Sequence, residues 1–103
     1  MTEATFLVLA ALAERPQHGY AVLEDVKRIS DGEVKLHVGS LYAVLERLAR
    51  DGLIEVDREE IVQSRLRRYY RLSGLGVAAL RDQTARLKRH AGVAETRLGL
   101  GAA

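Results

Sequence analysis

The sequence of 103 residues contains no cysteine, which excludes disulfide bonds, thiolate zinc sites and a cysteine nucleophile. It also lacks any apolar run approaching the roughly 20 residues that span a membrane. The apolar run 6–13 is short and follows Glu3 rather than a basic cluster. We therefore expect no signal peptide, no membrane association and a cytoplasmic location. Tryptophan is absent and Pro16 is the only proline.

Apolar residues make up 48% of the chain, enough for one domain with a modest core. The formal net charge is only +2, but nucleic acid is not excluded, because the distribution of charge matters more than its sum. No internal repeat or linker divides the sequence. We expect one compact domain comprising residues 1–72 and a final helix at 73–98, followed by a flexible tail at 99–103.

Apolar periodicity predicts three helices in the first half of the chain, at 2–14, 19–29 and 38–50. Pro16 ends the first helix, and the pairs Asp31-Gly32 and Asp51-Gly52 follow the other two. Each helix has a face that we expect to point inward, and in the first helix Leu7, Val8 and Leu12 broaden this face, so we expect that helix to be buried on more than one side. These faces comprise Phe6, Leu9, Ala10 and Ala13, then Val22, Val26 and Ile29, then Leu41, Val44, Leu45 and Leu48.

Alternating polarity after the third helix predicts two antiparallel strands. Ile54 and Val56 form an inward face in the first strand, and Tyr70 and Leu72 share a face in the second. The connecting turn is expected near Gln63-Ser64.

Ser73 can cap a final helix that continues to Leu98. This helix carries small and apolar residues at alternating spacings of three and four, which is a heptad seam. We interpret the seam as a dimerisation surface, because a lone projecting helix would leave Leu87 and Leu98 in water. The alternative is packing against the chain's own first helix. The predicted dimerisation residues are Phe6, Leu9, Val77, Leu80, Thr84, Leu87, Ala91, Ala94 and Leu98.

The element order α-α-α-β-β-α predicts a mainly α (α+β) winged helix-turn-helix fold with a small hairpin. In such folds the third helix enters the DNA major groove, and the hairpin wing reaches the flanking backbone or minor groove. Five arginines between Arg58 and Arg71 favour DNA contact over simple solvation, although Glu59 and Glu60 dilute this positive charge. Two alternatives stay open: a winged helix for protein–protein contact without an operator, and a DNA-binding regulator of the MarR-like or ArsR-like families.

Three blocks of the sequence resemble the PadR family of bacterial transcriptional regulators. They are LVLAALAERPQHGYAVLEDV (7–26), GSLYAVLERLARDGLIE (39–55) and RLRRYYRLSGLG (65–76). The resemblance implies a homodimeric repressor that binds a palindromic promoter site and is released by a small molecule or stress signal. The short last helix resembles the compact subgroup of the family.

The chain departs from the family pattern at three places. The family often has proline where this chain has Ala43, and usually a serine or aspartate cap where this chain has His37. The wing tip has no glycine. Because tryptophan is absent, we do not expect the drug-stacking pocket that compact family members can form between tryptophans.

We expect two groups of DNA contacts, one at the start of the third helix and one on the wing. Gly39 would let the helix backbone approach DNA, and His37 could touch a phosphate. The side chains expected to read base edges are Ser40, Tyr42, Ala43 and Arg47. The expected wing contacts are Arg65, Arg67 and Arg68.

A dinucleotide-like pattern, G-x-G-x-x-A, occurs at 74–79, but only 24 residues follow it and they offer no second parallel strand. We expect Gly76 instead to allow the last helix to start close against the wing.

The three histidines, His18, His37 and His90, have no metal-ligand spacing, and no Ser-His-Asp arrangement is present. We therefore expect no metal, no cofactor and no enzyme activity. His18 is expected to hydrogen-bond locally. Tyr20 and Tyr70 are expected to hold their elements to the core.

Overall fold

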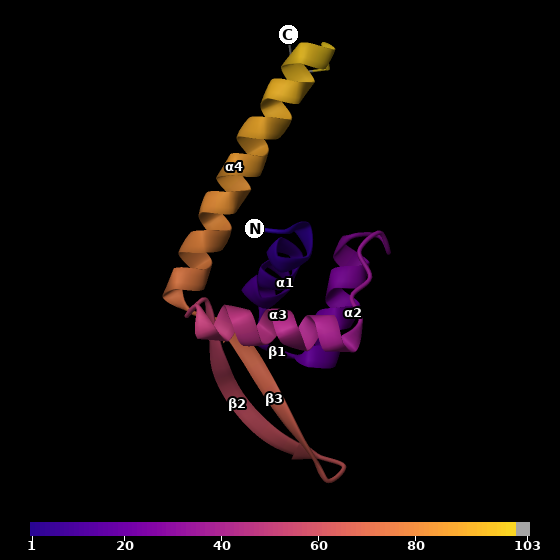
Figure 1. The fold of residues 1–103 in the computed structure, drawn as a ribbon, viewed down its shortest axis with the longest axis vertical. Helices are drawn as coiled ribbons and strands as arrows, with labels where there is room; N and C mark the ends of the chain where they lie inside the picture. Colours follow the sequence, from indigo (N-terminus) through magenta and orange to yellow (C-terminus); the bar gives the residue numbers. More distant parts are fainter. Residues whose placement is uncertain (101–103) are drawn as a thin grey trace.

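The computed structural model describes residues 1–100, which form four helices and one three-stranded antiparallel sheet. The elements are α1 (Glu3–Glu14), β1 (Gln17–His18), α2 (Gly19–Ile29), α3 (Val38–Arg50), β2 (Ile54–Val62), β3 (Arg65–Leu72) and α4 (Gly74–Leu98). Figure 1 shows α1, α2 and α3 gathered in one group, with the β2–β3 hairpin extending to one side and α4 to the other. The winged helix-turn-helix fold class is confirmed.

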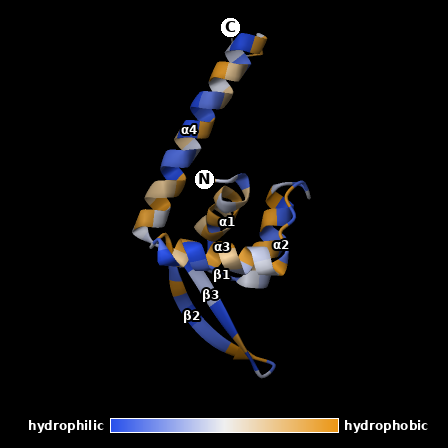
Figure 2. Cartoon of the chain, viewed as in Figure 1, coloured by the Kyte–Doolittle hydropathy of each residue, from blue (hydrophilic) through white to orange (hydrophobic). Residues whose placement is uncertain are grey.

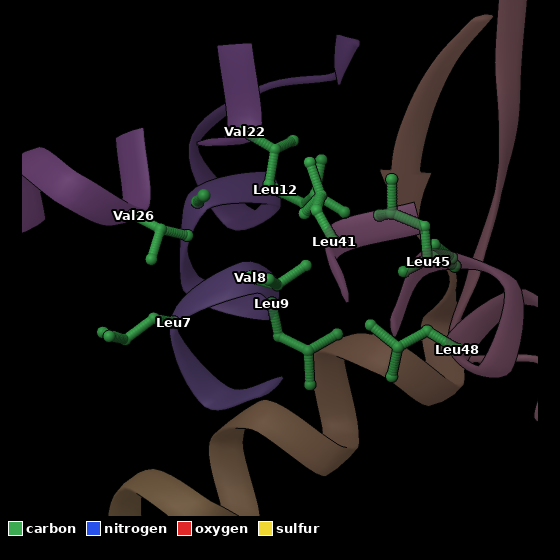
Figure 3. Packing of buried hydrophobic residues seen from close by; sticks show 11 residues of the cluster. Leu7, Val8, Leu9, Leu12, Val22, Val26, Leu41, Leu45 and Leu48 are labelled. Carbon is green, nitrogen blue, oxygen red and sulfur yellow. The ribbon is translucent and has the colours of Figure 1, made fainter. Parts of the chain in front are cut away.

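The core lies where α1 meets α2, α3 and the base of the hairpin (Figure 3). α1 supplies nearly half of its side chains, because apolar residues surround most of this helix. The core side chains are Leu7, Val8, Leu9, Ala11, Leu12, Val22, Val26, Leu41, Leu45, Leu48 and Ile54. Partly buried residues, including Phe6, Val44, Tyr70, Leu72 and Leu80, pack against this cluster.

Hydroxyl side chains cap two of the helices, α1 by Thr2, which was not predicted, and α4 by Ser73, as predicted. The Thr2 hydroxyl accepts a hydrogen bond from the Thr5 backbone N–H at 3.1 Å, and the Ser73 hydroxyl accepts one from Gly76 at 3.0 Å. The first turn of α4 also passes close to the chain segment before β2. A Cβ atom at Gly76 would overlap the carbonyl oxygen of Leu53, so the expected close approach at this glycine is confirmed.

The hairpin turn lies at Gln63 and Ser64, as predicted. Both residues have positive φ angles, 51° and 65°. Two consecutive left-handed residues are typical of the two-residue type I′ hairpin turn, whose twist matches that of the flanking strands. Val62 and Arg65 pair directly across this turn, so the wing has a tight tip rather than a loop.

Strand β1 was not predicted from the sequence. Its two residues pair with β3, Gln17 with Tyr70 and His18 with Tyr69, in the sheet order β1-β3-β2. The Gln17 side chain is buried, and its Nε2 donates to the Ala11 carbonyl at 2.7 Å and to Asp25 Oδ2 at 3.1 Å. This polar contact joins α1, β1 and α2 where α1 ends, and it fixes the base of the wing to the helices.

Four apolar or aromatic residues lie closer to solvent than predicted. Ala13 and Ile29 are exposed in the final turns of α1 and α2, beyond the core. Tyr20 is exposed in the first turn of α2 and does not hold that helix to the core. Val56 is exposed beside a β-bulge at Asp57 that interrupts the register between β2 and β3.

The last helix ends at Leu98, as predicted, because Gly99 adopts a left-handed conformation with φ of 74°. The backbone N–H of Leu100 donates to the Glu95 carbonyl at 2.8 Å and completes the cap. The predicted flexible tail falls largely on residues 101–103, which lie outside the described residues. Within residues 1–100, every helix is too short or too polar to cross a membrane.

Candidate nucleic-acid interface

The first turn of α3 presents a group of exposed residues that the core does not require. Leu41 is fully buried, whereas Gly39, Ser40, Tyr42 and Ala43 around it are exposed. A Cβ atom at Gly39 would meet no atom within 4 Å. Packing within the chain therefore does not explain a glycine at this position.

The amino end of α3 has no side-chain cap. His37 occupies the N-cap position with an extended backbone, but its side chain makes no capping hydrogen bond. Its carbonyl oxygen accepts the first helical bond, from the Leu41 N–H at 2.9 Å. The backbone N–H groups of the first turn have no intrahelical acceptor, and the residues of this turn are exposed, as is usual at an anion-binding helix end.

Tyr42 lies across the start of α2. A Cβ atom at Gly19 would come within 2.6 Å of the Tyr42 hydroxyl oxygen and 2.9 Å of the adjacent ring carbon. Gly19 therefore leaves the space that the Tyr42 ring occupies. The ring is fixed by α2 on one side and remains exposed on the other.

Arg47 is tied to α1. Its Nη2 donates a hydrogen bond of 3.2 Å to the hydroxyl of Thr5, which is itself bonded to the Thr2 hydroxyl at 2.9 Å. Thr5 is buried, so it provides a fixed anchor for an otherwise exposed guanidinium. This geometry directs the predicted contact residue Arg47 toward the α1 side of α3.

The β2–β3 hairpin, called the wing below, carries a chain of ion pairs along its base. Arg71 Nε lies 3.2 Å from Glu55, and Arg71 Nη1 lies 3.2 Å from Asp57. Arg58 Nη1 lies 3.0 Å from Asp57, and Arg58 Nε lies 2.8 Å from Glu60. Pairing with Glu60 and Asp57 raises the pKa of Arg58, while Arg58 lowers the pKa of Glu60. This ion-pair chain neutralises two of the five wing arginines.

The three predicted wing contacts differ in their surroundings. Arg68 Nη2 lies 3.2 Å from Glu59, its cross-strand neighbour. Arg65 and Arg67 make no ion pair within residues 1–100, although Glu60 is the cross-strand neighbour of Arg67. Uncompensated positive charge on the wing is thus concentrated near the tip.

His18 and Tyr69 join the wing to the start of α2. Their rings meet edge to face with centroids 5.3 Å apart, and the Arg58 guanidinium lies 3.8 Å from the centre of the Tyr69 ring. His18 makes no side-chain capping bond to α2, so the expected local hydrogen bond is wrong. Burial lowers the pKa of His18, and Arg67 lowers it further.

A second candidate surface runs along α4, whose carboxyl-terminal half projects away from the rest of the chain (Figure 1). Of the predicted seam, Leu80 and Thr84 are half-buried, whereas Val77, Leu87, Ala91, Ala94 and Leu98 are exposed. Phe6 is half-buried on α1. Leu9 has no exposed surface because it lies inside the core, which removes it from any direct contact with a second copy.

Sequence reasoning identified Glu59 and Glu60 as acidic residues of the wing but missed which arginines they pair with, and it missed the anchors of the α3 side chains. The ion pairs follow from strand register, which places Glu59 opposite Arg68. The register was not available from sequence, because no Asn-Gly or Asp-Gly marks the turn. The contacts of Thr5 with Arg47 and of Gly19 with Tyr42 join distant helices and leave no local pattern.

The helix-turn-helix of α2 and α3, the wing and the long final helix together define a winged helix-turn-helix protein. A family model described as the Transcriptional regulator PadR-like family matches residues 8–82. The chain belongs to this family of transcriptional regulators.

Solved structures from the same family have this fold. A PadR family regulator from Clostridium difficile R20291 is 21% identical, with a TM-score of 0.76, over 94% of this chain and 99% of its own. A regulator from Eggerthella lenta DSM 2243 is 28% identical, with a TM-score of 0.74, over 94% and 82% of the two chains. Bacillus subtilis PadR in complex with operator DNA is 21% identical, with a TM-score of 0.70, over 78% and 46%.

Proposed function

We propose that this protein binds a palindromic promoter site as a homodimer and represses transcription until a small-molecule or stress signal releases it. DNA binding is supported by the family and by a structural neighbour, Bacillus subtilis PadR, that was solved with operator DNA. Repression and signal release are supported by family resemblance.

The observation that carries this proposal is the uncapped, exposed first turn of α3. Its backbone N–H groups bind a phosphate, with His37 beside them. Gly39 allows the backbone to approach the duplex. The side chains proposed to read base edges in the major groove are Ser40, Tyr42, Ala43 and Arg47. Arg47 does so by exchanging its hydrogen bond to Thr5 for one to a base.

The wing adds electrostatic affinity. Arg65 and Arg67 carry charge that no ion pair within residues 1–100 compensates, so each releases a condensed counterion when it meets a phosphate. Arg68 contributes less, because binding DNA must compete with its contact to Glu59. The ion-pair chain at the base of the wing adds little to the attraction for DNA.

The second copy is proposed to pack along α4. This helix carries five basic and two acidic side chains between Arg81 and Arg97, whereas α1 carries Glu3 and Glu14 and no basic residue. An open groove of about 800 Å³ continues the seam between α1 and the first half of α4, with Leu12, Pro16, Leu72, Val77 and Leu80 among its lining residues. Apolar continuity and opposite charge favour α1 of one copy against α4 of its partner.

The contact residues proposed for the dimer are Phe6, Val77, Leu80, Thr84, Leu87, Ala91, Ala94 and Leu98. A two-fold dimer presents two copies of α3, so we expect half-sites whose centres are about 10 bp, or a multiple of it, apart. The same symmetry explains why the operator is proposed to be palindromic.

DNA binding is tested by titrating the protein into a duplex from upstream of its own gene and into a scrambled duplex of equal composition, at one stated salt concentration. We expect the native sequence to bind at least about tenfold more tightly. Equal, weak binding of the two duplexes would support a protein–protein module instead.

Dimerisation is tested by light scattering on Leu87→Glu, with Leu75→Glu as the matched control. Both leucines are exposed on α4, but Leu75 lies off the seam. We expect monomers for Leu87→Glu and dimers for Leu75→Glu, because a charge buried at the seam would lack a partner. A dimer that survives Leu87→Glu would contradict the proposed seam.

A further inference from the structure

The tip of the wing exposes two large apolar side chains. Ile61 on β2 and Leu66 on β3 face each other across the hairpin, and 77% and 62% of their surfaces are accessible. Figure 2 shows the end of the hairpin as a hydrophobic band beyond the polar stretch of the wing. Tyr70 and Leu72 occupy the same face nearer the base, where they pack against the core.

The turn keeps this apolar pair exposed. Gln63 and Ser64 close the hairpin in two residues, so no loop can fold back over the pair. Only the pair formed by Val62 and Arg65 separates Ile61 and Leu66 from the turn. The apolar surface therefore lies at the outermost part of the wing.

The two faces of the tip have different chemistry. Because side chains alternate along a strand, Arg65 and Arg67 project from the face opposite to Leu66. The tip thus combines an apolar surface with two cations that make no ion pair within residues 1–100. A DNA minor groove offers both matching features: deoxyribose groups form its walls, and phosphates form its rims.

We propose that Ile61 and Leu66 pack against deoxyribose groups in the minor groove beside the site of α3, while Arg65 and Arg67 meet the flanking phosphates. This inference rests on the proposed DNA-binding function and deepens it. The wing would then contribute to DNA affinity in two ways: through apolar burial, which does not depend on salt, and through electrostatic attraction, which does.

A second copy of the chain is the competing occupant of the apolar pair. The charge at the tip disfavours it, because a symmetric contact between two apolar faces would leave Arg65 and Arg67 of both chains on the outer faces without a partner. The polyanionic duplex instead satisfies the arginines and covers the leucine and isoleucine in the same contact.

The test compares the double variant Ile61→Ser/Leu66→Ser with the native chain on a duplex selected from a random-sequence pool. Affinity is measured across a range of salt concentrations. We expect the double variant to bind about tenfold more weakly at every salt concentration, because apolar burial is lost while charge is unchanged. The slope of log K against log[salt] should stay the same.

Leu75→Ser is the matched control, because Leu75 is 65% exposed but lies in the first turn of α4. It should bind like the native chain. All three proteins should have similar melting temperatures, because these side chains contribute little to the core. A loss of affinity in Leu75→Ser equal to that of the double variant would overturn the assignment to the wing tip.

A second measurement addresses the groove. Replacing flanking G·C pairs by inosine·C pairs removes the guanine amino group from the minor groove and leaves the major groove unchanged. We expect this replacement to improve binding of the native chain more than that of the double variant. An equal effect on both proteins would overturn minor-groove packing.

The outcomes separate this inference from the proposed function. If the native chain selects no duplex from the pool, the DNA-binding function fails. If it selects one and the double variant binds equally well, only the wing-tip contact fails. Smaller assemblies of the double variant in light scattering would assign the apolar pair to a second copy and overturn the minor-groove proposal.

Discussion

The two elements proposed to contact DNA, α3 and the wing, are built in opposite ways. α3 is held by core leucines on one side, and two of its outward side chains are fixed by neighbouring helices, Tyr42 by Gly19 and Arg47 by Thr5. The wing is anchored only at its base, and most of its exposed residues contact one another. Under the proposed function, this difference assigns shape-dependent recognition to α3, and it assigns to the wing affinity that depends little on precise placement.

Charge shows the same division. The base of the wing carries the ion-pair chain from Glu55 to Glu60, in which each arginine contacts two carboxylates. Exposed ion pairs of this kind add little stability. Together with the Arg68–Glu59 pair, they leave Arg65 and Arg67, near the tip, as the wing arginines without an ion pair within residues 1–100.

The largest expected difference between α3 and the wing is in the free energy of unfolding that a leucine-to-alanine substitution removes. Leu45→Ala in α3 should lower the free energy of unfolding by about 2–5 kcal/mol, because Leu45 is fully buried and its loss leaves a cavity. Leu66→Ala at the wing tip should change it by no more than about 0.5 kcal/mol. Urea denaturation measures both values. Equal losses would show that the wing is part of the cooperative core.

A second experiment asks whether α3 depends on its neighbours. Gly19→Ala should weaken DNA binding about tenfold, because the new Cβ atom displaces the Tyr42 ring. Stability should change little, since the displaced group is the free end of a side chain.

A double-mutant cycle separates this mechanism from a direct effect of Gly19. If Gly19 acts through Tyr42, the combined variant Gly19→Ala/Tyr42→Ala should bind DNA like Tyr42→Ala alone. Additive losses would show that Gly19 contributes by another route.

Much of the fold could be predicted because it depends on local signals. Helix periodicity, Asp51-Gly52 and the Ser73 cap gave the bounds of α3 and α4 to within one residue. Strand β1 could not be predicted, because two residues are too short for an alternating pattern and the strand exists only through its pairing with β3. Tyr20 was misplaced because it stands two residues from Val22, which puts it on the side of α2 opposite to the buried face.

The candidate site was predictable in its residues but not in its geometry. The exposure of Gly39, Ser40 and Tyr42 follows from the burial of Leu41, which period alone gives. The neutralisation of Arg58 and Arg71 cannot be predicted from sequence periodicity, because it depends on a β-bulge at Asp57 that brings this carboxylate to both arginines. Counting charges in the sequence therefore does not show which wing arginines are paired and which remain without an ion pair within residues 1–100.

A smaller effect than the two above is expected in the salt dependence of DNA binding when a single wing arginine is removed. Arg65→Ala should reduce the slope of log K against log[salt] by about 1, because one phosphate contact is lost. The charge-balanced variant Arg58→Gln/Glu60→Gln should leave the slope unchanged, since it removes an ion pair that is already neutral. A reduced slope in the balanced variant would show that Arg58 leaves its carboxylates to meet DNA.

The smallest expected effect concerns His18, where the wing meets α2. Its pKa is lowered in the folded chain, so the folded state disfavours the protonated form. The resulting stability is fully present above the ordinary histidine pKa of about 6.5 and is lost as the pH falls through the lower, folded pKa. Urea denaturation should therefore show that the free energy of unfolding of the native chain decreases from about pH 7.5 to about pH 5.5. The decrease should be smaller in His18→Gln.

This pH window separates His18 from the wing carboxylates. The pKa of Glu60 is also lowered, but its contribution persists until the pH falls below the ordinary glutamate value of about 4.5. The effect would belong to other groups if the free energy of unfolding decreased equally in His18→Gln and the native chain between about pH 7.5 and about pH 5.5. If the free energy of unfolding decreases only in the native chain, the contact of His18 with Tyr69 couples the wing to the helices. The base of the wing is then stabilised by the rest of the fold, as α3 is, whereas the tip of the wing is not.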